Sequence, residues 1–542
     1  MRHLLFMAVL SALLGIVPQP EKVEEMKGNF RIAGATFNCE MSLDRESQDL
    51  ISEFADRLAM ISDRTVSFAP SPTLRSNAAS GLLKGVCFLL DKDKISGEYS
   101  LEVTPKYVLV FASDFYGFTY ALQTIRQLLP PAIYGTSPAP GEKWVLPCCK
   151  ITDKPRFAYR GLLLDCSRHF FKVEEIYRIL EIMNVYKLNR FHWHLSDDQG
   201  WRVEIKKYPM LTVAGAYRSG TQIGRERGSN DGIGYGGFYT REEIRSVVAY
   251  ARKLGITIIP EIDLPGHMQA ALAAYPELGC SGGPYRVRTG WGVSDQVLCP
   301  GKEETFAFIE GVMNEICDLF PSEYIHIGGD ECPKTEWEKC PDCQARIAAL
   351  GLTSHNGVSK EQRLQNYVTE RVQKYLASKG RRIIGWDEIL EGELAKGATV
   401  MSWRGTAGGI KAAAAGFDVI MSPNIYCYFD HSQSTELSKE PLGPTQNPKR
   451  AIPLEKIYSF EPLLNMEAGS TSHVLGVQAN LWTEYIAEPS HLEYMLLPRL
   501  LALSEVQWCN KEVRDYDRFR AEVAGHQSAI LNIMGYTFRP VD

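Results

Sequence analysis

From about residue 155 onward, short apolar runs alternate with stretches whose apolar residues recur at helical spacing. In the stretch 242–254, for example, the apolar positions fall on one face of a helix. Eight apolar runs occur in this part of the chain: GLLLDCS (161–167), NRFHWHLS (189–196), ITIIPEID (256–263), YIHIGGD (324–330), RIIGWDE (382–388), TVMSWRG (399–405), DVIMSPN (418–424) and VLGVQANLW (474–482). Eight strands alternating with helices over about 350 residues predict an α/β fold, a (β/α)8 TIM barrel.

The segment before the barrel has a different pattern. Residues from about 20 to 150 mix short β-branched and aromatic runs with one amphipathic stretch at 117–129, and they end in a Pro- and Gly-rich segment. This pattern predicts a small α+β domain that precedes the barrel. We therefore divide the chain as follows: a signal peptide (1–17), an N-terminal α+β domain (18–152), a catalytic barrel (153–508) and a helical C-terminal extension (509–542).

The first 17 residues have a basic tip followed by an apolar stretch that ends in small residues, which is typical of a secretory signal peptide. The apolar stretch is shorter than the roughly 20 residues that cross a bilayer, so we expect no stable membrane span. The expected location is across the inner membrane, in the periplasm or outside the cell. A net charge of -6 also argues against a nucleic-acid partner, because phosphates demand clustered Lys and Arg.

The chain has 13 cysteines, of which Cys340 and Cys343 have the spacing of a metal site. A closed zinc site needs four ligands, and no second CxxC pair occurs to supply them. We therefore expect a local disulfide or free thiols here and no metal. Cys280 and Cys299 flank a Gly-rich loop and could close it with a disulfide bond. No cofactor motif occurs either, because GIGYGG (232–237) does not lie between a strand and a helix N-terminus.

Charged and aromatic residues follow the ends of all eight predicted strands, where barrel enzymes place their chemistry. Tryptophan faces cover the apolar faces of a pyranose ring, while carboxylates and arginine bind its hydroxyls. A cluster of this composition predicts a sugar ligand. Two of the carboxylates, Asp330 and Glu331, are adjacent and follow Gly328 and Gly329.

Adjacent residues on a strand point to opposite faces, so two functional neighbours require the turn that the two glycines permit. Even then, Asp330 and Glu331 would approach a ligand from one side, whereas glycosidases with an enzyme nucleophile place two carboxylates on either side of the bond. The alternative is that a 2-acetamido group of the substrate acts as the nucleophile. One acid then protonates the leaving oxygen, and its neighbour holds the acetamide N–H.

Five motifs resemble those of the family 20 glycoside hydrolases, the β-N-acetylhexosaminidases. They are LDCSRHF (164–170), FHWHLSDDQGWR (191–202), PEIDLPGH (260–267), HIGGDE (326–331) and LWTEY (481–485). They follow the family order over about 350 residues of a TIM barrel. The preceding segment, with weaker motifs, resembles the non-catalytic domain of that family.

The resemblance implies a retaining, substrate-assisted, exo-acting hydrolase. Its substrate would be a glycan or chitooligosaccharide that ends in β-linked N-acetylglucosamine or N-acetylgalactosamine. The implied catalytic residues are Glu331 as acid and base, Asp330 on the acetamide, and Asp197 with His267 as a relay behind Glu331. The implied substrate-binding residues are Arg168, Tyr428, Asp430, Trp386, Trp403, Trp482, Glu484 and, in a supporting position, His194.

Several alternatives stay open at this point. Tyr426 lies close to Tyr428 in the sequence and could be the acetamide donor instead. His192 and His194, on one face of a strand, could contribute to the metal site of a metal-dependent barrel hydrolase, although the tryptophans would then be unexplained. A sugar-binding protein without catalysis is the other alternative, but it would have no use for a proton donor. The gluco or galacto preference and the oligomeric state are not predicted.

Overall fold

The computed structural model describes residues 15–392 and 397–541, which form two compact units. The described part of unit 1 consists of residues 15–156, 185–187 and 504–541, and unit 2 consists of residues 157–184 and 188–503. The predicted signal peptide lies mostly outside the described residues. Its last residues, Ile16 and Val17, are buried in unit 1, where the Gln127 side chain hydrogen-bonds to both the N–H and the C=O of Val17.

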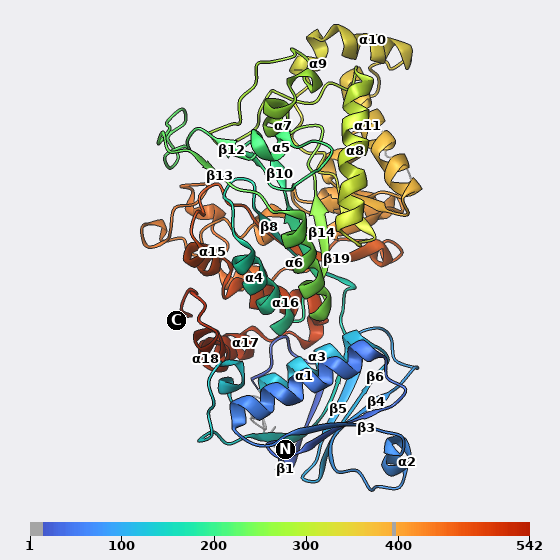
Figure 1. The fold of residues 1–542 in the computed structure, drawn as a ribbon, viewed down its shortest axis with the longest axis vertical. Coiled ribbons are helices and arrows are strands. Elements are labelled where there is room, and N and C mark those ends of the chain that lie inside the picture. The colour runs from blue at the N-terminus through green and yellow to red at the C-terminus, as the bar shows by residue number, and fades with distance from the viewer. Residues whose placement is uncertain (1–14, 393–396, 542) are drawn as a thin grey trace, which may run out of the picture. The chain divides into compact units, whose positions relative to one another are not determined.

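Unit 1 is built on a mixed seven-stranded sheet with the order β1-β7-β5-β6-β4-β2-β3. Helices α1 (Arg45–Ser62) and α3 (Phe115–Leu128) cover one face of the sheet (Figure 1). Asp44 caps α1 by accepting from the Ser47 N–H, and Asp114 caps α3 in the same way. The strands are β1 (Lys22–Arg31), β2 (Thr36–Glu40), β3 (Ser67–Ser71), β4 (Gly85–Leu90), β5 (Tyr99–Val103), β6 (Tyr107–Ala112) and β7 (Val145–Asp153). The predicted small domain of strands and helices is confirmed.

The end of the chain also belongs to unit 1. It contains α17 (Tyr516–Glu522) and α18 (Ser528–Ile533), and α18 packs on the short helix η1 (Pro131–Tyr134). The helices predicted for the C-terminal extension are therefore present, and they share a core with the small domain.

Unit 2 is a closed barrel of eight parallel strands in the order β14-β15-β16-β17-β18-β19-β8-β9 (Figure 1). The last strand pairs with the first, Val477 opposite Arg160, which closes the barrel. Seven of the eight predicted runs contain one of these strands, and the run 161–167 overlaps β8, which begins two residues earlier. The strands are β8 (Tyr159–Asp165), β9 (Arg190–His194), β14 (Thr257–Glu261), β15 (Tyr324–His326), β16 (Arg382–Trp386), β17 (Thr399–Ser402), β18 (Asp418–Met421) and β19 (Val474–Leu481). The predicted barrel is confirmed.

In unit 2 a helix forms at the stretch 242–254, where the apolar spacing predicts it. In this helix, α6 (Arg241–Lys253), Ile244, Val247 and Ala251 are buried, and Thr240 and Glu243 form a capping box at its start. The other long helices are α4 (Val173–Val185), α8 (Glu303–Leu319), α11 (Lys360–Ser378) and α16 (Arg499–Trp508), whose last residues, from 504 on, belong to unit 1. None of the helices in the described part of the chain has the length and apolar character needed to cross a bilayer.

Side chains fill the inside of the barrel, so it is a packed core and not a channel. One buried cluster joins residues from several strands: Tyr159, Leu163, Ile259, Ile384, Trp386, Met401 and Ile420. Trp403 and Trp482, which follow strand ends, pack against this cluster while staying partly exposed. The packed interior leaves the loops after the strands as the place where a ligand can bind.

Candidate active site

A cavity of about 220 Å³ opens among the loops at the carboxyl ends of the barrel strands. Ten of the twelve predicted site residues line it: Arg168, Asp197, His267, Asp330, Glu331, Trp403, Tyr428, Asp430, Trp482 and Glu484. They come from loops after β8, β9, β14, β15, β17, β18 and β19. The predicted convergence of strand-end residues is therefore found in one cavity.

The turn after β15 sets the direction of the two adjacent acids. Gly328 and Gly329 have φ values of 64° and 98°, and Glu331 itself has a φ of 43°. A Cβ on Gly328 would lie 1.7 Å from Oδ1 of Asp263, so only glycine fits there. The left-handed turn, predicted from the glycine pair, brings both Asp330 and Glu331 to the cavity.

Asp330 is a largely buried carboxylate with unused hydrogen-bonding capacity, and its side chain is 13% exposed. Its Oδ1 has no hydrogen-bond partner among the residues that the structure describes. Burial raises the pKa of Asp330 to about 6; the charge of His267 opposes this shift, and the charges of Glu261 and Glu331 add to it. A cavity-lining carboxylate in this state is suited to a ligand N–H or a developing positive charge.

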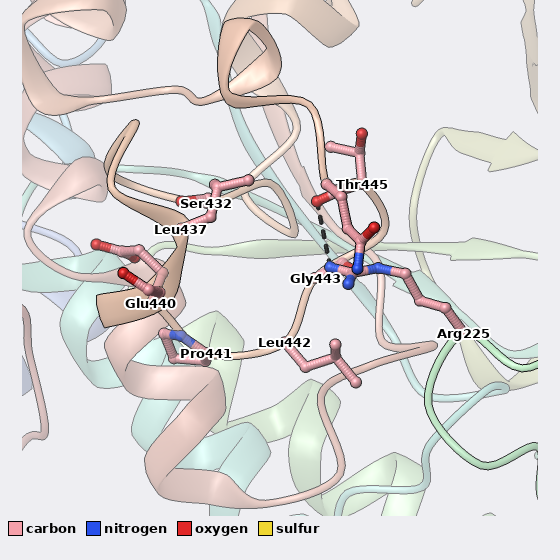
Figure 2. Close-up of a pocket in the computed structure, with 10 residues that line it drawn as sticks. Arg225, Ser432, Leu437, Glu440, Pro441, Leu442, Gly443 and Thr445 are labelled. Atoms are coloured by element: carbon pink, nitrogen blue, oxygen red, sulfur yellow. Dashed lines mark hydrogen bonds between the residues drawn. The ribbon is translucent and has the colours of Figure 1, made fainter.

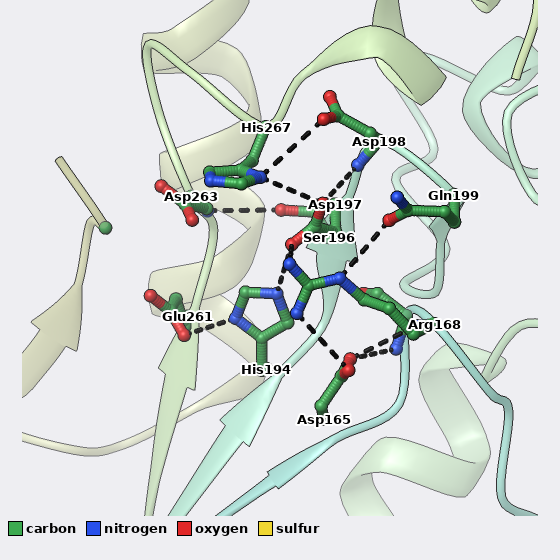
Figure 3. Close-up of polar contacts among 12 residues, drawn as sticks. Asp165, Arg168, His194, Ser196, Asp197, Asp198, Gln199, Glu261, Asp263 and His267 are labelled. Carbon is green, nitrogen blue, oxygen red and sulfur yellow. Dashed lines mark hydrogen bonds and ion pairs between the residues drawn. The ribbon is translucent and has the colours of Figure 1, made fainter. Parts of the chain in front are cut away.

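Glu331 belongs to a chain of contacts that runs back into the protein. His267 Nε2 lies 3.6 Å from Glu331 Oε2. The other ring nitrogen, His267 Nδ1, lies 3.1 Å from Asp197 Oδ1 (Figure 3). Burial opposes the charged form of His267, but Asp197 and Glu331 raise its pKa well above the ordinary value. The three residues have the geometry of the predicted relay, with a positively charged imidazole between two carboxylates.

The pKa of Glu331 is shifted in the direction opposite to that of Asp330. The contact with His267 lowers it, although burial acts to raise it. The Glu331 side chain is also 39% exposed, so the burial effect is incomplete. A sugar that covered Glu331 would remove it from water and raise its pKa towards the range that a general acid needs.

Arg168 is held at the cavity by partners on three sides (Figure 3). Its guanidinium contacts Asp165 Oδ2 at 3.3 Å and Asp197 Oδ2 at 2.7 Å, and its Nε donates to Gln199 Oε1 at 3.2 Å. It also lies 5.0 Å from the centre of the Trp482 ring. These contacts fix the orientation of the Arg168 guanidinium. Its paired N–H donors suit two neighbouring hydroxyls of a sugar.

The aromatic wall consists of Trp403, Tyr428 and Trp482. The rings of Trp403 and Tyr428 are stacked with centroids 6.0 Å apart, and Trp482 lies 6.3 Å from Tyr428. Burial, together with Asp330, raises the pKa of Tyr428 well above its ordinary value, so its phenol remains a hydrogen-bond donor. Tyr426 instead stacks on Phe460 at 4.7 Å and is not among the cavity residues, so the geometry favours Tyr428 as the donor.

Two predicted residues, Trp386 and His194, do not line the cavity. Trp386 is 1% exposed, packs against Trp482 and donates from its indole nitrogen to Glu261. His194 is completely buried between Glu261 and Asp197 (Figure 3). His194 therefore has the supporting position that the resemblance implies, next to Asp197, and Trp386 packs against Trp482; the role of Trp386 at the substrate stays a prediction.

The structure also places residues at the site for which no role was predicted. Asn424, His431 and Arg450 line the cavity, and Glu388, at the end of the predicted run 382–388, accepts from the Trp403 indole nitrogen at 2.9 Å. Burial raises the pKa of Glu388 to about 8, and Asp330 adds to the shift. Position after a strand could have identified Asn424, whereas His431 and Arg450 lie in a segment without any recognisable motif.

Some buried groups in unit 2 also have the residue types of a metal site. The ligand atoms of His192, Glu261 and His326 lie within 4.8 Å of one another, and so do those of Asp263, His267 and Asp330. In the first group Glu261 already contacts both histidines, at 3.0 Å and 2.9 Å. These contacts stabilise the buried Glu261 carboxylate from within the protein.

A second, larger cavity of about 400 Å³ lies beside the segment 432–446 (Figure 2). Arg225 donates to the C=O of Gly443 at 2.7 Å and joins two loops at this cavity. Its lining has no cluster of carboxylates or aromatic rings, so we place the chemistry in the smaller cavity. Ser432 lines the larger cavity and His431 the smaller one, so the two are adjacent along the chain.

Comparisons with known proteins agree with this geometry. A β-hexosaminidase of Porphyromonas gingivalis is 40% identical over 511 residues, 93% of this chain and 62% of the relative, so the chain spans less than two thirds of that protein. A β-hexosaminidase of Akkermansia muciniphila is 35% identical, with 90% of each chain covered. The structure of a Vibrio harveyi GH20 exo-β-N-acetylglucosaminidase in complex with N-acetylglucosamine has a TM-score of 0.82 and 34% identity, covering 98% of this chain and 79% of that one.

The two units also match family models separately. Residues 13–154 match the model described as glycosyl hydrolase family 20, domain 2. Residues 157–511, well over half of the chain, match the model of the catalytic domain of the same family. With its barrel, adjacent acids and aromatic wall, this chain belongs to glycosyl hydrolase family 20.

Proposed function

We propose that this protein is an exo-acting β-N-acetylhexosaminidase that removes terminal, non-reducing, β-linked N-acetylglucosamine or N-acetylgalactosamine with retention of configuration. The observation that carries the proposal is the pair Asp330 and Glu331 at the cavity, with Oδ1 of Asp330 unpaired among the described residues. Relatives named β-hexosaminidases and the N-acetylglucosamine in the Vibrio harveyi structure support it.

The arrangement of the acids favours a nucleophile from the substrate. His267 Nε2 lies 3.8 Å from Asp330 Oδ2 and 3.6 Å from Glu331 Oε2, so both acids approach from the same side. A retaining enzyme with its own nucleophile places its two carboxyl groups on either side of the bond. The acetamide carbonyl of the sugar can supply the missing attack from the other face.

In the first step, the acetamide oxygen attacks the anomeric carbon while the glycosidic C–O bond breaks, and Glu331 gives its proton to the leaving oxygen. The resulting oxazolinium ring carries a positive charge that Asp330 stabilises through the acetamide N–H. In the second step, water attacks the anomeric carbon, Glu331 takes a proton from it, and the ring opens to restore the acetamide. Two inversions at one carbon give retention.

The rest of the cavity accounts for binding of one terminal sugar. Trp403 and Trp482 would surround the acetamide methyl group, and Tyr428 would donate to its carbonyl oxygen. Arg168, Glu484 and Asp430 would bind ring hydroxyls, and Oδ1 of Asp430 has no partner among the described residues. Asp197 and His267 would set the proton affinity of Glu331.

The sugars beyond the scissile bond would contact the loop after β18. The adjacent cavity at Ser432 and Gly443 offers space for them (Figure 2). A glycan or chitooligosaccharide is therefore the proposed substrate class. For the location, the N-terminal sequence supports export across the inner membrane; N-terminal sequencing of the mature protein tests this, and an intact Met1 would contradict it.

A substrate panel tests the activity. We expect cleavage of p-nitrophenyl β-N-acetylglucosaminide or β-N-acetylgalactosaminide, and none of the corresponding β-glucoside and β-galactoside, which lack the acetamide. Replacing the acetyl group with trifluoroacetyl should slow the reaction strongly because the carbonyl is then a poor nucleophile, and NMR should show the β-anomer as first product. Cleavage of the plain glycosides at a comparable rate would contradict substrate assistance; no cleavage at all would favour a sugar-binding protein.

A further inference from the structure

Four cysteines of unit 2 converge at a place outside the catalytic cavity. Cys280 follows the short helix η2 (Pro276–Leu278), Cys299 precedes α8, and Cys340 and Cys343 lie at the start of α10 (Pro341–Ala349). Their four sulfur atoms lie within 4.8 Å of one another. Cys299, Cys340 and Cys343 are fully or almost fully buried, and Cys280 is partly buried.

The spacing of the sulfurs matches one tetrahedral metal ion. Cys299 Sγ lies 3.5 Å from Cys343 Sγ and 3.7 Å from Cys340 Sγ, and Cys280 Sγ lies 3.8 Å from Cys343 Sγ. Four thiolates at about 2.3 Å from a zinc ion have S···S edges of about 3.8 Å, whereas a disulfide bond is about 2.05 Å long. We propose that Cys280, Cys299, Cys340 and Cys343 bind one structural zinc ion. Four protein ligands leave no open position for catalysis.

The expectation of no metal here rested on the lack of a second CxxC pair. The structure shows why that reasoning was incomplete: the other two ligands come from separate positions, Cys280 and Cys299, that the fold brings to the Cys340–Cys343 turn. Such a site cannot be recognised from local spacing. Cys280 and Cys299, which flank a loop, lie close to each other and also against the Cys340–Cys343 turn.

The surrounding residues hold the four positions in place. A Cβ on Gly301 would lie 2.3 Å from the carbonyl carbon of Asp342, so glycine is needed where the two segments meet. Thr305 Oγ1 donates to the C=O of Cys299 at 2.8 Å, and the Trp337 indole donates to the C=O of Leu298 at 2.9 Å. Lys302 binds the C=O of Gly279 at 2.8 Å, which places a cation near the net negative charge of a tetrathiolate zinc site.

The site is connected to the catalytic loops. Cys332, which directly follows Glu331, packs against the hydrophobic cluster that includes Cys299, Cys340 and Cys343. Leu298 donates its N–H to the C=O of Pro265 at 3.1 Å, two residues before His267. An ion bound here would therefore stabilise the positions of the segment after Glu331 and of the segment that carries His267. The four cysteines act as positioning residues, and the proposal does not depend on the substrate.

The competing state is a pair of disulfides, which would suit an exported protein. Metal analysis of the wild-type protein, purified without added metal, separates the two. We expect about one zinc ion per chain and four thiols that react with a mercurial only as zinc is released. Two disulfides among these cysteines by non-reducing peptide mapping, four thiols without zinc, or one iron per chain in place of zinc would each overturn the proposal.

Matched variants locate the ion. Cys299→Ser and Cys343→Ser should reduce the zinc content to below about one tenth of wild type, whereas Cys317→Ser, on α8 outside the cluster, should retain it. Zinc retained in both cluster variants would contradict the site. If those variants do not fold, cobalt-grown wild-type protein provides the same answer, because a tetrathiolate site shows thiolate-to-cobalt charge-transfer bands that an oxygen or nitrogen site lacks. Absence of these bands in a cobalt-loaded protein would overturn the assignment.

Discussion

Each unit of this protein contains an aspartate that is fully or largely buried, Asp153 in unit 1 and Asp330 in unit 2, and the two differ in how their oxygens are used. In unit 1, Asp153 accepts from Lys187 at 2.9 Å, from Tyr99 at 2.7 Å and from the Trp508 indole at 2.8 Å. In unit 2, Asp330 lies near other carboxylates, and its Oδ1 has no partner among the described residues. The first aspartate is fully satisfied by the protein, and the second is not.

The difference distinguishes a structural carboxylate from a catalytic one. A buried charge with a cation and several donors stabilises the fold as long as all partners remain. A buried carboxylate without partners costs stability, and its pKa rises. The lost stability is regained only when a ligand supplies the missing hydrogen-bond donor or positive charge. The following predictions test this contrast, from the largest expected effect to the smallest.

The largest effect is expected from Glu331→Gln. Glutamine cannot donate the proton, so kcat/KM for a chitooligosaccharide should fall by about 10³-fold or more. The loss for a p-nitrophenyl glycoside should be much smaller, because that leaving group needs no proton. Because the side chain is 39% exposed, the thermal unfolding midpoint should be nearly unchanged. Equal losses on both substrates would contradict the acid role.

Lys187→Met should produce the opposite phenotype. It leaves the Asp153 carboxylate buried without its cation, since both side chains are 0% exposed, and should cost about 3–5 kcal/mol in the free energy of unfolding. Denaturant unfolding measures this. The exposed Lys106→Met is the matched control and should stay within about 0.5 kcal/mol of wild type. The activity of Lys187→Met per folded molecule should equal that of wild type. If its free energy of unfolding were unchanged, the structural role assigned to Asp153 would be contradicted.

Asp330→Asn should combine lost activity with gained stability. We expect kcat to fall by about 10²-fold on N-acetyl substrates because the neutral amide cannot stabilise the oxazolinium charge. The folded pKa of Asp330 is about 6, above its usual 3.8, so ionisation destabilises the fold increasingly from pH 3.8 to 6 and fully above that range. The variant should therefore be more stable than wild type by about 1–2 kcal/mol at pH 7.5.

The stability gain of Asp330→Asn should shrink as the pH falls and vanish below about pH 3, where the wild-type carboxyl is protonated in both states. Thermal unfolding at the two pH values provides this comparison within one pair of proteins. A variant that is less stable than wild type at pH 7.5 would mean that Asp330 is satisfied after all.

Removing the phenol hydroxyl tests the donor to the acetamide. Tyr428→Phe should lower kcat/KM by about 10- to 100-fold, because one hydrogen bond to the reacting carbonyl is lost. Tyr426→Phe is the matched control, since its ring stacks on Phe460 away from the cavity, and should remain within about twofold. A larger loss for Tyr426→Phe would reverse the assignment.

The smallest effect is the acid limb of the pH profile. If Asp330 must be ionised, wild-type kcat/KM should decline below about pH 6, tenfold per unit. The limb should be absent in Asp330→Asn, whose residual activity has no such carboxyl. A limb at the same pH in the variant would assign it to another group.

Much of the fold and the site could be predicted from local sequence. Apolar runs of strand length alternate with helical spacing, and each run in unit 2 became one barrel strand. Gly328 and Gly329 predicted the turn that carries Asp330 and Glu331, because only glycine adopts that backbone at little cost. Order along the chain also placed ten of the predicted residues in one cavity, since parallel strands end on the same side.

Only the tertiary structure decided the properties that depend on neighbours distant in sequence. The nearly complete burial of Trp386 and His194 depends on their depth in the barrel, which a strand-end position does not give. The direction of the pKa shift of Glu331 depends on His267 from another loop. The four-cysteine site depends on three segments that meet in space. Local spacing determines elements and turns, whereas burial, charge pairing and metal geometry are set by which elements pack together.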